Sequence, residues 1–153
     1  MLDRSAVITA CLRFYKASDN HNAAQLLLEN GYYEAANDRA FFCVFHAARA
    51  LLAYDGLNYA MTDYMATGEI LKNFHDLYIR QRYHDPRLCV IFETARETRQ
   101  GGIYSRDFTA TKEEAEQNIK NAAYFLETAK IISKRRLTLE HDSPESGIPS
   151  NGF

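Results

Sequence analysis

The sequence contains little glycine and proline. Together they make up 10 of 153 residues, and two of the prolines, Pro144 and Pro149, lie among the last ten residues. Valine and isoleucine together occur only 12 times, against 20 alanines. Because strand-rich folds favour β-branched residues and frequent turns, this composition predicts an all-α fold. With 46% hydrophobic and 12% aromatic residues the chain can bury a core, which excludes wholesale disorder.

The signals of several other protein classes are also missing. No apolar run approaches the roughly 18 residues that a membrane helix needs, and residues 1–4 do not begin a secretory signal. The three cysteines, Cys11, Cys43 and Cys89, are far apart and form no CxxC, so neither a disulfide framework nor a zinc site is expected. No histidine pair has the HExxH spacing, and no glycine-rich phosphate loop is present. We therefore expect a cytoplasmic protein with no metal, no cofactor and no membrane contact.

The chain has no excess of positive charge, and its positive residues are unevenly distributed. The net charge of −2 excludes a general nucleic-acid coating protein. Residues 80–106 nevertheless contain six arginines against three acids: Arg80, Arg82, Arg87, Arg96, Arg99 and Arg106. Tyr83 and Tyr104 beside them could stack on unpaired bases. A second basic group is predicted to close the last helix: Lys130, Lys134, Arg135 and Arg136. Both groups could face phosphates, or they could be ordinary solvated and ion-paired helix faces.

Hydrophobic spacing and capping signals predict a bundle of four main helices and one shorter helix. The expected helices cover residues 4–29, 32–54, 62–82, about 86–101 and a segment that opens at Thr111, with residues 1–137 as one domain and 138–153 as a disordered tail. The polar stretch 18–22 leaves the continuity of the first helix open. Asp85-Pro86 is typical of an N-cap followed by proline at the first helical position. Thr111-x-x-Glu114 is typical of a capping box.

The second helix is apolar almost all the way round. Residues 40–52 read AFFCVFHAARALL, which predicts a helix at the centre of the bundle. Arg39 and His46 are seven residues apart, so they lie within ~20° of each other on the helix surface. The small residues Cys43 and Ala50 share this stripe and predict close contact with another surface. A bland alternative stays open, in which the histidine is a satisfied core residue, Arg39 pairs with Glu34 or Glu69, and Arg49 pairs with Asp55.

Residues 36–52, followed by Gly56, resemble the HEPN domains of bacteria and archaea. The similarity also covers residues 26–33 and 111–132, and extends over roughly residues 5–134. HEPN domains are small helical bundles, and many are toxins that cut RNA. The Arg-x6-His spacing of Arg39 and His46 falls within the family motif, whose arginine and histidine form the catalytic site at a homodimer interface. The resemblance thus implies catalytic roles for these two residues. The small residues Cys43 and Ala50 beside them predict that this face forms the homodimer interface.

The chemistry expected of this pair is metal-independent RNA cleavage. The 2′-OH attacks the adjacent phosphate, and the products are a 2′,3′-cyclic phosphate and a 5′-OH. His46 would move the proton and Arg39 would hold the phosphate. Arg49, Arg96 and Arg99 would add phosphate contacts. The predicted function is the toxin of a toxin–antitoxin or defence system, with a minimal nucleotidyltransferase as a candidate antitoxin. The alternative is a non-catalytic HEPN module that binds a nucleotide or a partner nucleotidyltransferase.

Overall fold

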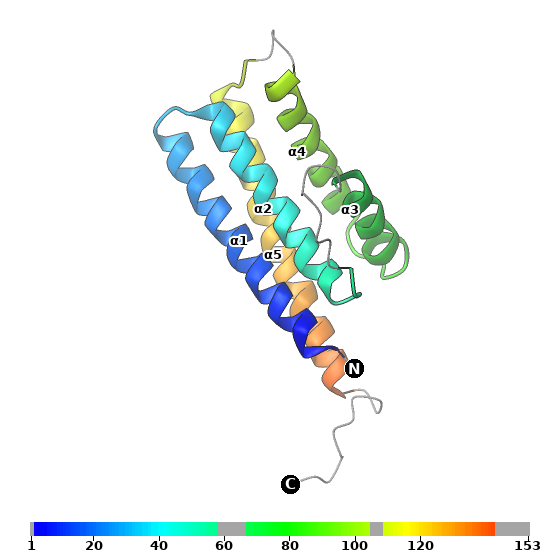
Figure 1. Ribbon diagram of the computed structural model, residues 1–153. Coiled ribbons are helices and arrows are strands. Elements are labelled where there is room, and N and C mark those ends of the chain that lie inside the picture. The colour runs from blue at the N-terminus through cyan, green and yellow to red at the C-terminus, as the bar shows by residue number, and fades with distance from the viewer. Residues whose placement is uncertain (1, 58–66, 105–108, 143–153) are drawn as a thin grey trace.

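The computed structural model describes residues 2–57, 67–104 and 109–142 (Figure 1). This part of the chain contains no strand, which confirms the all-α prediction. Its helices are α1 (Arg4–Glu29), α2 (Tyr33–Ala53), α3 (Thr67–Phe74), the π-helix η1 (His75–Arg80), α4 (Arg87–Tyr104) and α5 (Lys112–Asp142). None of them is long and apolar enough to cross a membrane.

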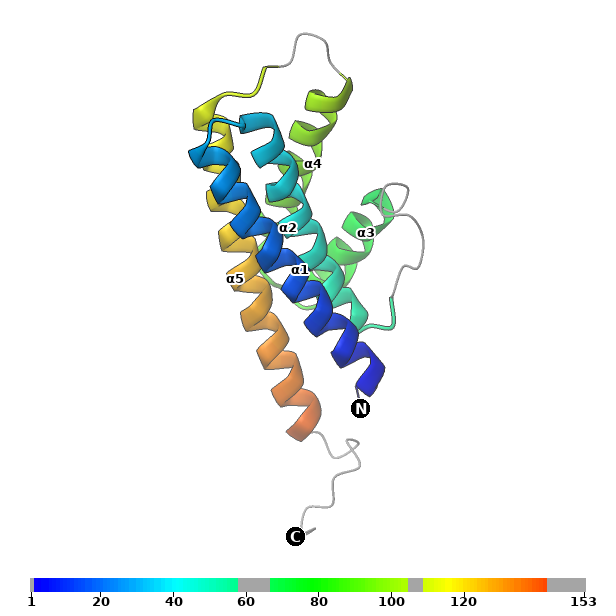
Figure 2. The ribbon, with the colours of Figure 1, turned by 60° about the vertical axis from the view of Figure 1, so that its left-hand side comes forward.

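The four long helices form an up-down-up-down bundle, and α3 with η1 lies against its side (Figures 1 and 2). Helix α2 packs against α1, α3, α4 and α5, and every residue from Cys43 to Ala53 is buried. This confirms the central position predicted from its apolar surface.

Asp85 and Thr111, the two predicted capping residues, each accept a backbone hydrogen bond at the start of a helix, and α4 begins at Arg87, one residue after Pro86. Asp85 Oδ1 accepts the Arg87 backbone N–H at 2.9 Å before α4, and Thr111 Oγ1 accepts the Glu114 N–H at 3.2 Å at the start of α5. Helix α1 runs unbroken through residues 18–22. The predicted third helix is described from Thr67 only, as α3 followed by η1. Residues 62–66 lie outside the described part.

Two expectations about the last helix were wrong. Helix α5 continues to Asp142, so residues 138–142, assigned to the tail, are helical. No glycine or proline precedes Pro144 in this region, and nothing in the local sequence stops the helix. The basic group that includes Lys134 and Arg136 therefore lies inside α5 rather than in its last turn. The rest of the predicted tail, residues 143–153, lies outside the described residues.

A seam of small residues joins α1 to α2. Ala10, Ala17 and Ala24 are seven residues apart, and all three are 0% exposed. The antiparallel helices are held in register by two hydrogen bonds between side chains, Arg13 to His46 and Asn20 to Arg39. In this register the three alanines face a matching series on α2, which is also 0% exposed and seven apart: Ala50, Cys43 and Ala36. Small residues on both sides let the helices approach closely.

Substitution of Ala17 by leucine tests this seam. The added side chain has no space between two backbones, so we expect A17L to lower the free energy of unfolding by about 1–3 kcal/mol. Urea unfolding followed by circular dichroism measures the change. Lys16→Leu is the matched control, because Lys16 is exposed on the same helix and its substitution should change stability by no more than about 0.5 kcal/mol. Equal effects of the two substitutions would contradict the close approach of α1 to α2.

Candidate active site

Three of the predicted site residues surround the aromatic ring of Phe42, which is half-buried on α2. The guanidinium carbon of Arg39 lies 5.1 Å from the centre of this ring, and that of Arg99, from α4, lies 4.9 Å from it. The imidazole of His46 stacks beside the ring, with the ring centres 6.2 Å apart. The packing of α4 on α2 therefore brings Arg99 to the Arg39–His46 pair. We call Phe42, Arg39, His46 and Arg99 the Phe42 cluster.

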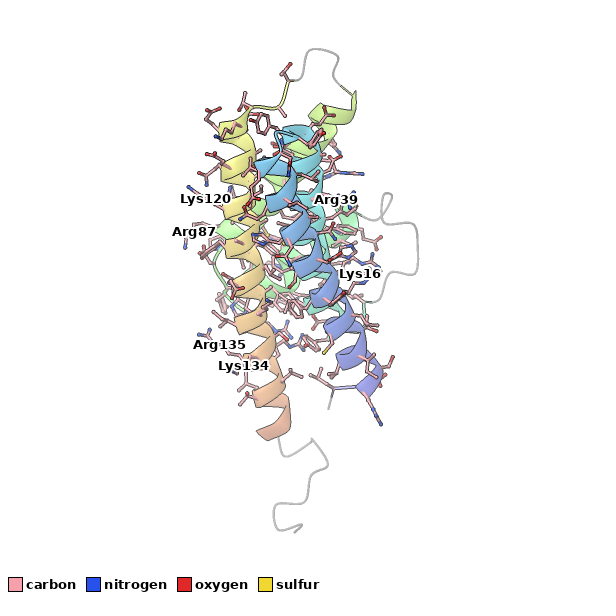
Figure 3. All side chains as sticks on the ribbon, turned by 90° about the vertical axis from the view of Figure 1, so that its left-hand side faces the viewer. Lys16, Arg39, Arg87, Lys120, Lys134 and Arg135 are labelled. Atoms are coloured by element: carbon pink, nitrogen blue, oxygen red, sulfur yellow. The ribbon has the colours of Figure 1, made fainter. Side chains whose placement is uncertain are left out.

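Helix α1 supplies two polar partners that the sequence reasoning missed. Arg13 Nη1 donates to His46 Nδ1 at 3.3 Å, and Arg39 Nη1 donates to Asn20 Oδ1 at 3.2 Å. Thus Arg39, which is exposed (Figure 3), meets an amide rather than the carboxylates considered above. A signal for both partners was present in the sequence. Arg13 and Asn20 are seven residues apart and follow Ala10 and Ala17 by three, so they lie on the seam that faces α2.

The hydrogen bond from Arg13 determines what His46 offers. A guanidinium can only donate, so Nδ1 of His46 must accept, and the proton of the neutral ring is then carried by Nε2. The side chain is 7% exposed and is further enclosed by the ring of Phe45, whose centre is 5.6 Å away. In this arrangement His46 is a hydrogen-bond donor through Nε2 and has its lone pair directed at Arg13.

Asp38 shows the electrostatic character of the cluster. Partial burial raises the pKa of this carboxyl group, the cations Arg99 and Arg39 oppose that rise, and Glu34 adds to it. Both guanidinium groups are therefore close enough to Asp38 to stabilise its anionic form. Asp38 in turn offsets part of the positive charge that these two arginines and Arg13 bring to the cluster.

The other predicted arginines are not gathered into one patch. Arg96 Nη1 lies 3.8 Å from Glu93 Oε1 on the same helix. The Arg96 guanidinium also lies beside Gly68 at the start of α3, where an added Cβ would be 3.6 Å from Nη2. Arg80, Arg82 and Arg87 form ion pairs with Asp76, Asp55 and Asp85 at 3.7, 3.3 and 2.7 Å. Arg106 and the side chain of Tyr104 lie outside the described residues. Arg96 thus forms an ion pair with a neighbouring acid, the alternative to a phosphate contact that the sequence left open.

Three predicted site residues are buried within the chain and need correction. Arg49 is 3% exposed, with its guanidinium carbon 5.4 Å from the centre of the Phe45 ring, so it is a buried cation and not a surface contact for phosphate. Cys43 and Ala50, predicted to face a second copy, are 0% exposed in the single chain. Cys43 Sγ also lies 3.9 Å from the carbonyl oxygen of Ala122 on α5. The close partner of this stripe is a helix of the same chain.

A second polar cluster joins the far end of α2 to η1 and α5. Arg136 Nη1 donates to Asp55 Oδ1 at 2.8 Å and to the Tyr78 hydroxyl at 2.7 Å, and Arg82 Nη2 lies 3.3 Å from the same Asp55 oxygen. The Tyr78 hydroxyl in turn lies 2.7 Å from the carbonyl oxygen of Leu51. Burial raises the pKa of Tyr78, so the phenol stays protonated. Asp55 thus pairs with Arg136 and Arg82 and not with Arg49, the partner considered from the sequence.

In residues 2–57, 67–104 and 109–142, no group of three or more His, Cys, Asp or Glu side chains is arranged to hold a metal ion. The Phe42 cluster offers an imidazole and guanidinium groups, which can transfer a proton and bind an anion.

Comparison with known proteins identifies related chains. The family model described as "HEPN domain" matches residues 11–132, a range that contains the whole Phe42 cluster. "Putative toxin MJ0605" of Methanocaldococcus jannaschii is 31% identical to this chain over 121 residues, which are 79% of this chain and 86% of the relative. "Putative toxin MJ0142" of the same organism is 28% identical over 133 residues, which are 86% of this chain and 87% of the relative.

The burial of Cys43 predicts a sharp difference in thiol reactivity. Burial raises the pKa of Cys43 to about 12, against a small opposing effect of Lys130, and burial and Glu93 raise that of Cys89 to about 11. Cys11 is exposed on α1. Because the thiolate is the reactive form, we expect only Cys11 to react rapidly with a chromogenic disulfide reagent near pH 8, and all three to react in guanidinium chloride. Cys11→Ser should abolish the rapid phase. Rapid labelling of Cys43 in the folded protein would show that α1 does not cover it.

Proposed function

This chain belongs to the HEPN domain family, and on that premise we propose that it is a metal-independent endoribonuclease, acting as the toxin of a toxin–antitoxin or defence system. The observation that carries the proposal is the Phe42 cluster, in which a histidine and two arginines from different helices gather around one ring. The names of its two archaeal relatives support the toxin role.

In the proposed reaction the O2′–P bond forms, the P–O5′ bond breaks, and a proton passes from the 2′-oxygen to the 5′-oxygen through acid–base groups. His46 is the group in the cluster that can take up and release a proton near neutral pH. Arg39 is exposed, and its planar fork suits a phosphate that gains charge in the transition state. Arg99 adds a second guanidinium near the same ring, from α4.

Arg13 has a defined part in this proposal. While it donates to Nδ1, His46 has no lone pair with which to accept a proton. An RNA phosphate that enters the cluster competes for the same guanidinium, because a charge-assisted bond to phosphate is stronger than a bond to neutral imidazole. We propose that phosphate binding draws Arg13 away and leaves Nδ1 of His46 able to act as a base.

A homodimer remains part of the proposed function. One histidine serves poorly as both acid and base, and a symmetric pair of clusters in one cleft supplies two. Since α1 covers Cys43 and Ala50, a second copy would approach next to the exposed Arg39 rather than on that stripe. A minimal nucleotidyltransferase antitoxin is the proposed partner in the cell.

The non-catalytic alternative is favoured by one observation. His46 is 7% exposed and already hydrogen-bonded to Arg13, as a structural histidine would be. In that case the cluster would bind a nucleotide or a partner nucleotidyltransferase without cutting RNA.

Cleavage of single-stranded RNA in excess EDTA tests the proposal. We expect His46→Asn to lower the rate about 10²–10⁴-fold, because the asparagine carbonyl can still accept from Arg13 while the titratable ring is lost. Arg39→Lys should also lose most of the activity, since lysine keeps the charge but not the two-pronged contact. Lys16→Leu, on the outer surface of α1, serves as the active control.

The same measurements separate the two functions. Unchanged activity in both variants would place the cleavage elsewhere, and loss of wild-type activity in EDTA would contradict a metal-independent reaction. If light scattering shows a stable dimer and the wild type does not cut RNA, the non-catalytic alternative replaces the proposal. A monomer that cuts RNA would remove the two-histidine mechanism.

Arg99 and Arg96 offer a matched pair for RNA binding. Arg99 belongs to the Phe42 cluster, whereas Arg96, one turn earlier, pairs with Glu93. We expect Arg99→Gln to weaken RNA binding and to reduce the slope of log affinity against log salt by about 0.7, the value for one lost phosphate contact on a single strand. Arg96→Gln should change both much less. Fluorescence anisotropy with labelled RNA measures the affinity and its salt dependence. Equal effects of the two substitutions would indicate that Arg96 and Arg99 belong to one continuous RNA-binding surface. Thermal melts check that both variants remain folded.

A further inference from the structure

A cavity of about 430 Å³ lies away from the Phe42 cluster, between the segment after η1 and the C-terminal half of α5. Its polar lining consists of six side chains, here called the basic pocket: Gln81, Arg82, Tyr83, His84, Arg135 and Arg136. The volume falls within the range of small-molecule sites. Figure 3 shows Arg135 and Arg39 toward opposite ends of the bundle and on opposite sides of it.

Positive charge exceeds negative charge in the basic pocket. Arg82 and Arg136 share one carboxylate, that of Asp55, at 3.3 and 2.8 Å. Arg135 adds a third guanidinium from the exposed side of α5. Asp55 therefore holds two of the cations in fixed positions but neutralises only one charge. Among the described lining residues, three guanidinium groups thus lie near one carboxylate.

His84 is in reach of these cations. Its pKa is lowered, first by partial burial and then by the positive charges of Arg135 and Arg82. Its ring also stacks on Tyr78, with the ring centres 6.1 Å apart. An imidazole near these arginines supplies a hydrogen-bonding group without a negative charge, which suits an anionic ligand.

Tyr83 is the most unusual residue of the pocket. Among the described residues it is the one non-glycine residue with positive φ, at +58°, while Gly31 and Gly56 occupy the other two such positions. The Tyr83 N–H donates to Ile79 O at 3.1 Å and the His84 N–H to Tyr78 O at 3.0 Å, so Tyr83 stands at a helix end where glycine is usual. Its side chain lines the cavity and is 88% exposed. A large ring is thus kept in a strained conformation without being buried in the core.

We propose that the basic pocket binds a small phosphorylated ligand with a planar ring, such as a nucleoside monophosphate. The phosphate is held by the fork of Arg135, which matches its oxygens in pairs. Arg82, whose Nη1 and Nη2 donate to Leu77 O and Asp55 Oδ1, adds its remaining N–H groups and its positive charge. The planar ring stacks on Tyr83, which explains an exposed aromatic side chain where glycine would fit better. This site is separate from the Phe42 cluster, so the proposal does not depend on ribonuclease activity.

Isothermal titration calorimetry of the full chain with AMP, inorganic phosphate and adenosine tests the proposal. AMP is expected to bind more tightly than phosphate, and adenosine not measurably. Arg135→Gln should weaken AMP binding at least tenfold with an unchanged melting temperature, because Arg135 is exposed and outside the Asp55 network. Tyr83→Gly should bring the affinity for AMP down to that for phosphate. The melting temperature of Tyr83→Gly should not fall, since glycine relieves the positive φ.

Two controls locate the ligand. Lys134→Gln removes one charge from the neighbouring position on α5, outside this cavity, and should change AMP affinity less than twofold. His46→Asn should leave AMP affinity unchanged, since it alters the other site. No binding of AMP, or equal losses in Lys134→Gln and Arg135→Gln, would overturn the proposal. Loss of binding in His46→Asn alone would assign the ligand to the Phe42 cluster and overturn it as well.

Discussion

The close antiparallel contact between α1 and α2 is the interaction on which the rest of the structure depends. Ala10, Ala17 and Ala24 have only methyl side chains, so α1 and α2 can approach closely, and the small-residue stripe of α2 is buried within the chain. In that register Arg13 and Asn20 have to meet His46 and Arg39. A single packing constraint therefore buries the catalytic candidate, fixes its tautomer and leaves Arg39 at the surface.

The neighbours of each arginine divide these residues into two groups. Arg87 and Arg96 lie against carboxylates, which compensate their charge. Arg39 and Arg99 lie over the ring of Phe42, which attracts the cations, and Asp38 offsets part of their charge. The same combination of guanidinium and aromatic groups recurs at the basic pocket. At both places a guanidinium group and an aromatic ring lie together on the part of the surface where an anion is proposed to bind.

Local features of the sequence were predictive because they depend on a few neighbouring residues. The Thr111 cap and the apolar surface of α2 follow from helical geometry, as does the placement of Arg39 and His46 on one side of α2. The end of α5 was misjudged, because Leu137 and Leu139 continue a helix that no residue before Pro144 stops. Arg13 was missed although its spacing from Ala10 and Ala17 was visible, since its importance depends on the helix that it faces.

By itself, the sequence determined an all-α bundle with a buried second helix that carries an arginine and a histidine two turns apart, because backbone hydrogen bonding and side-chain periodicity are local. Only the tertiary structure decided which surface covers Cys43 and Ala50, that Arg99 but not Arg96 joins the pair, and that Asp55 binds Arg82 and Arg136. Those outcomes depend on the register and rotation of helices far apart in the chain. They are set by the packing of small against small side chains and by the need of each buried charge for a partner.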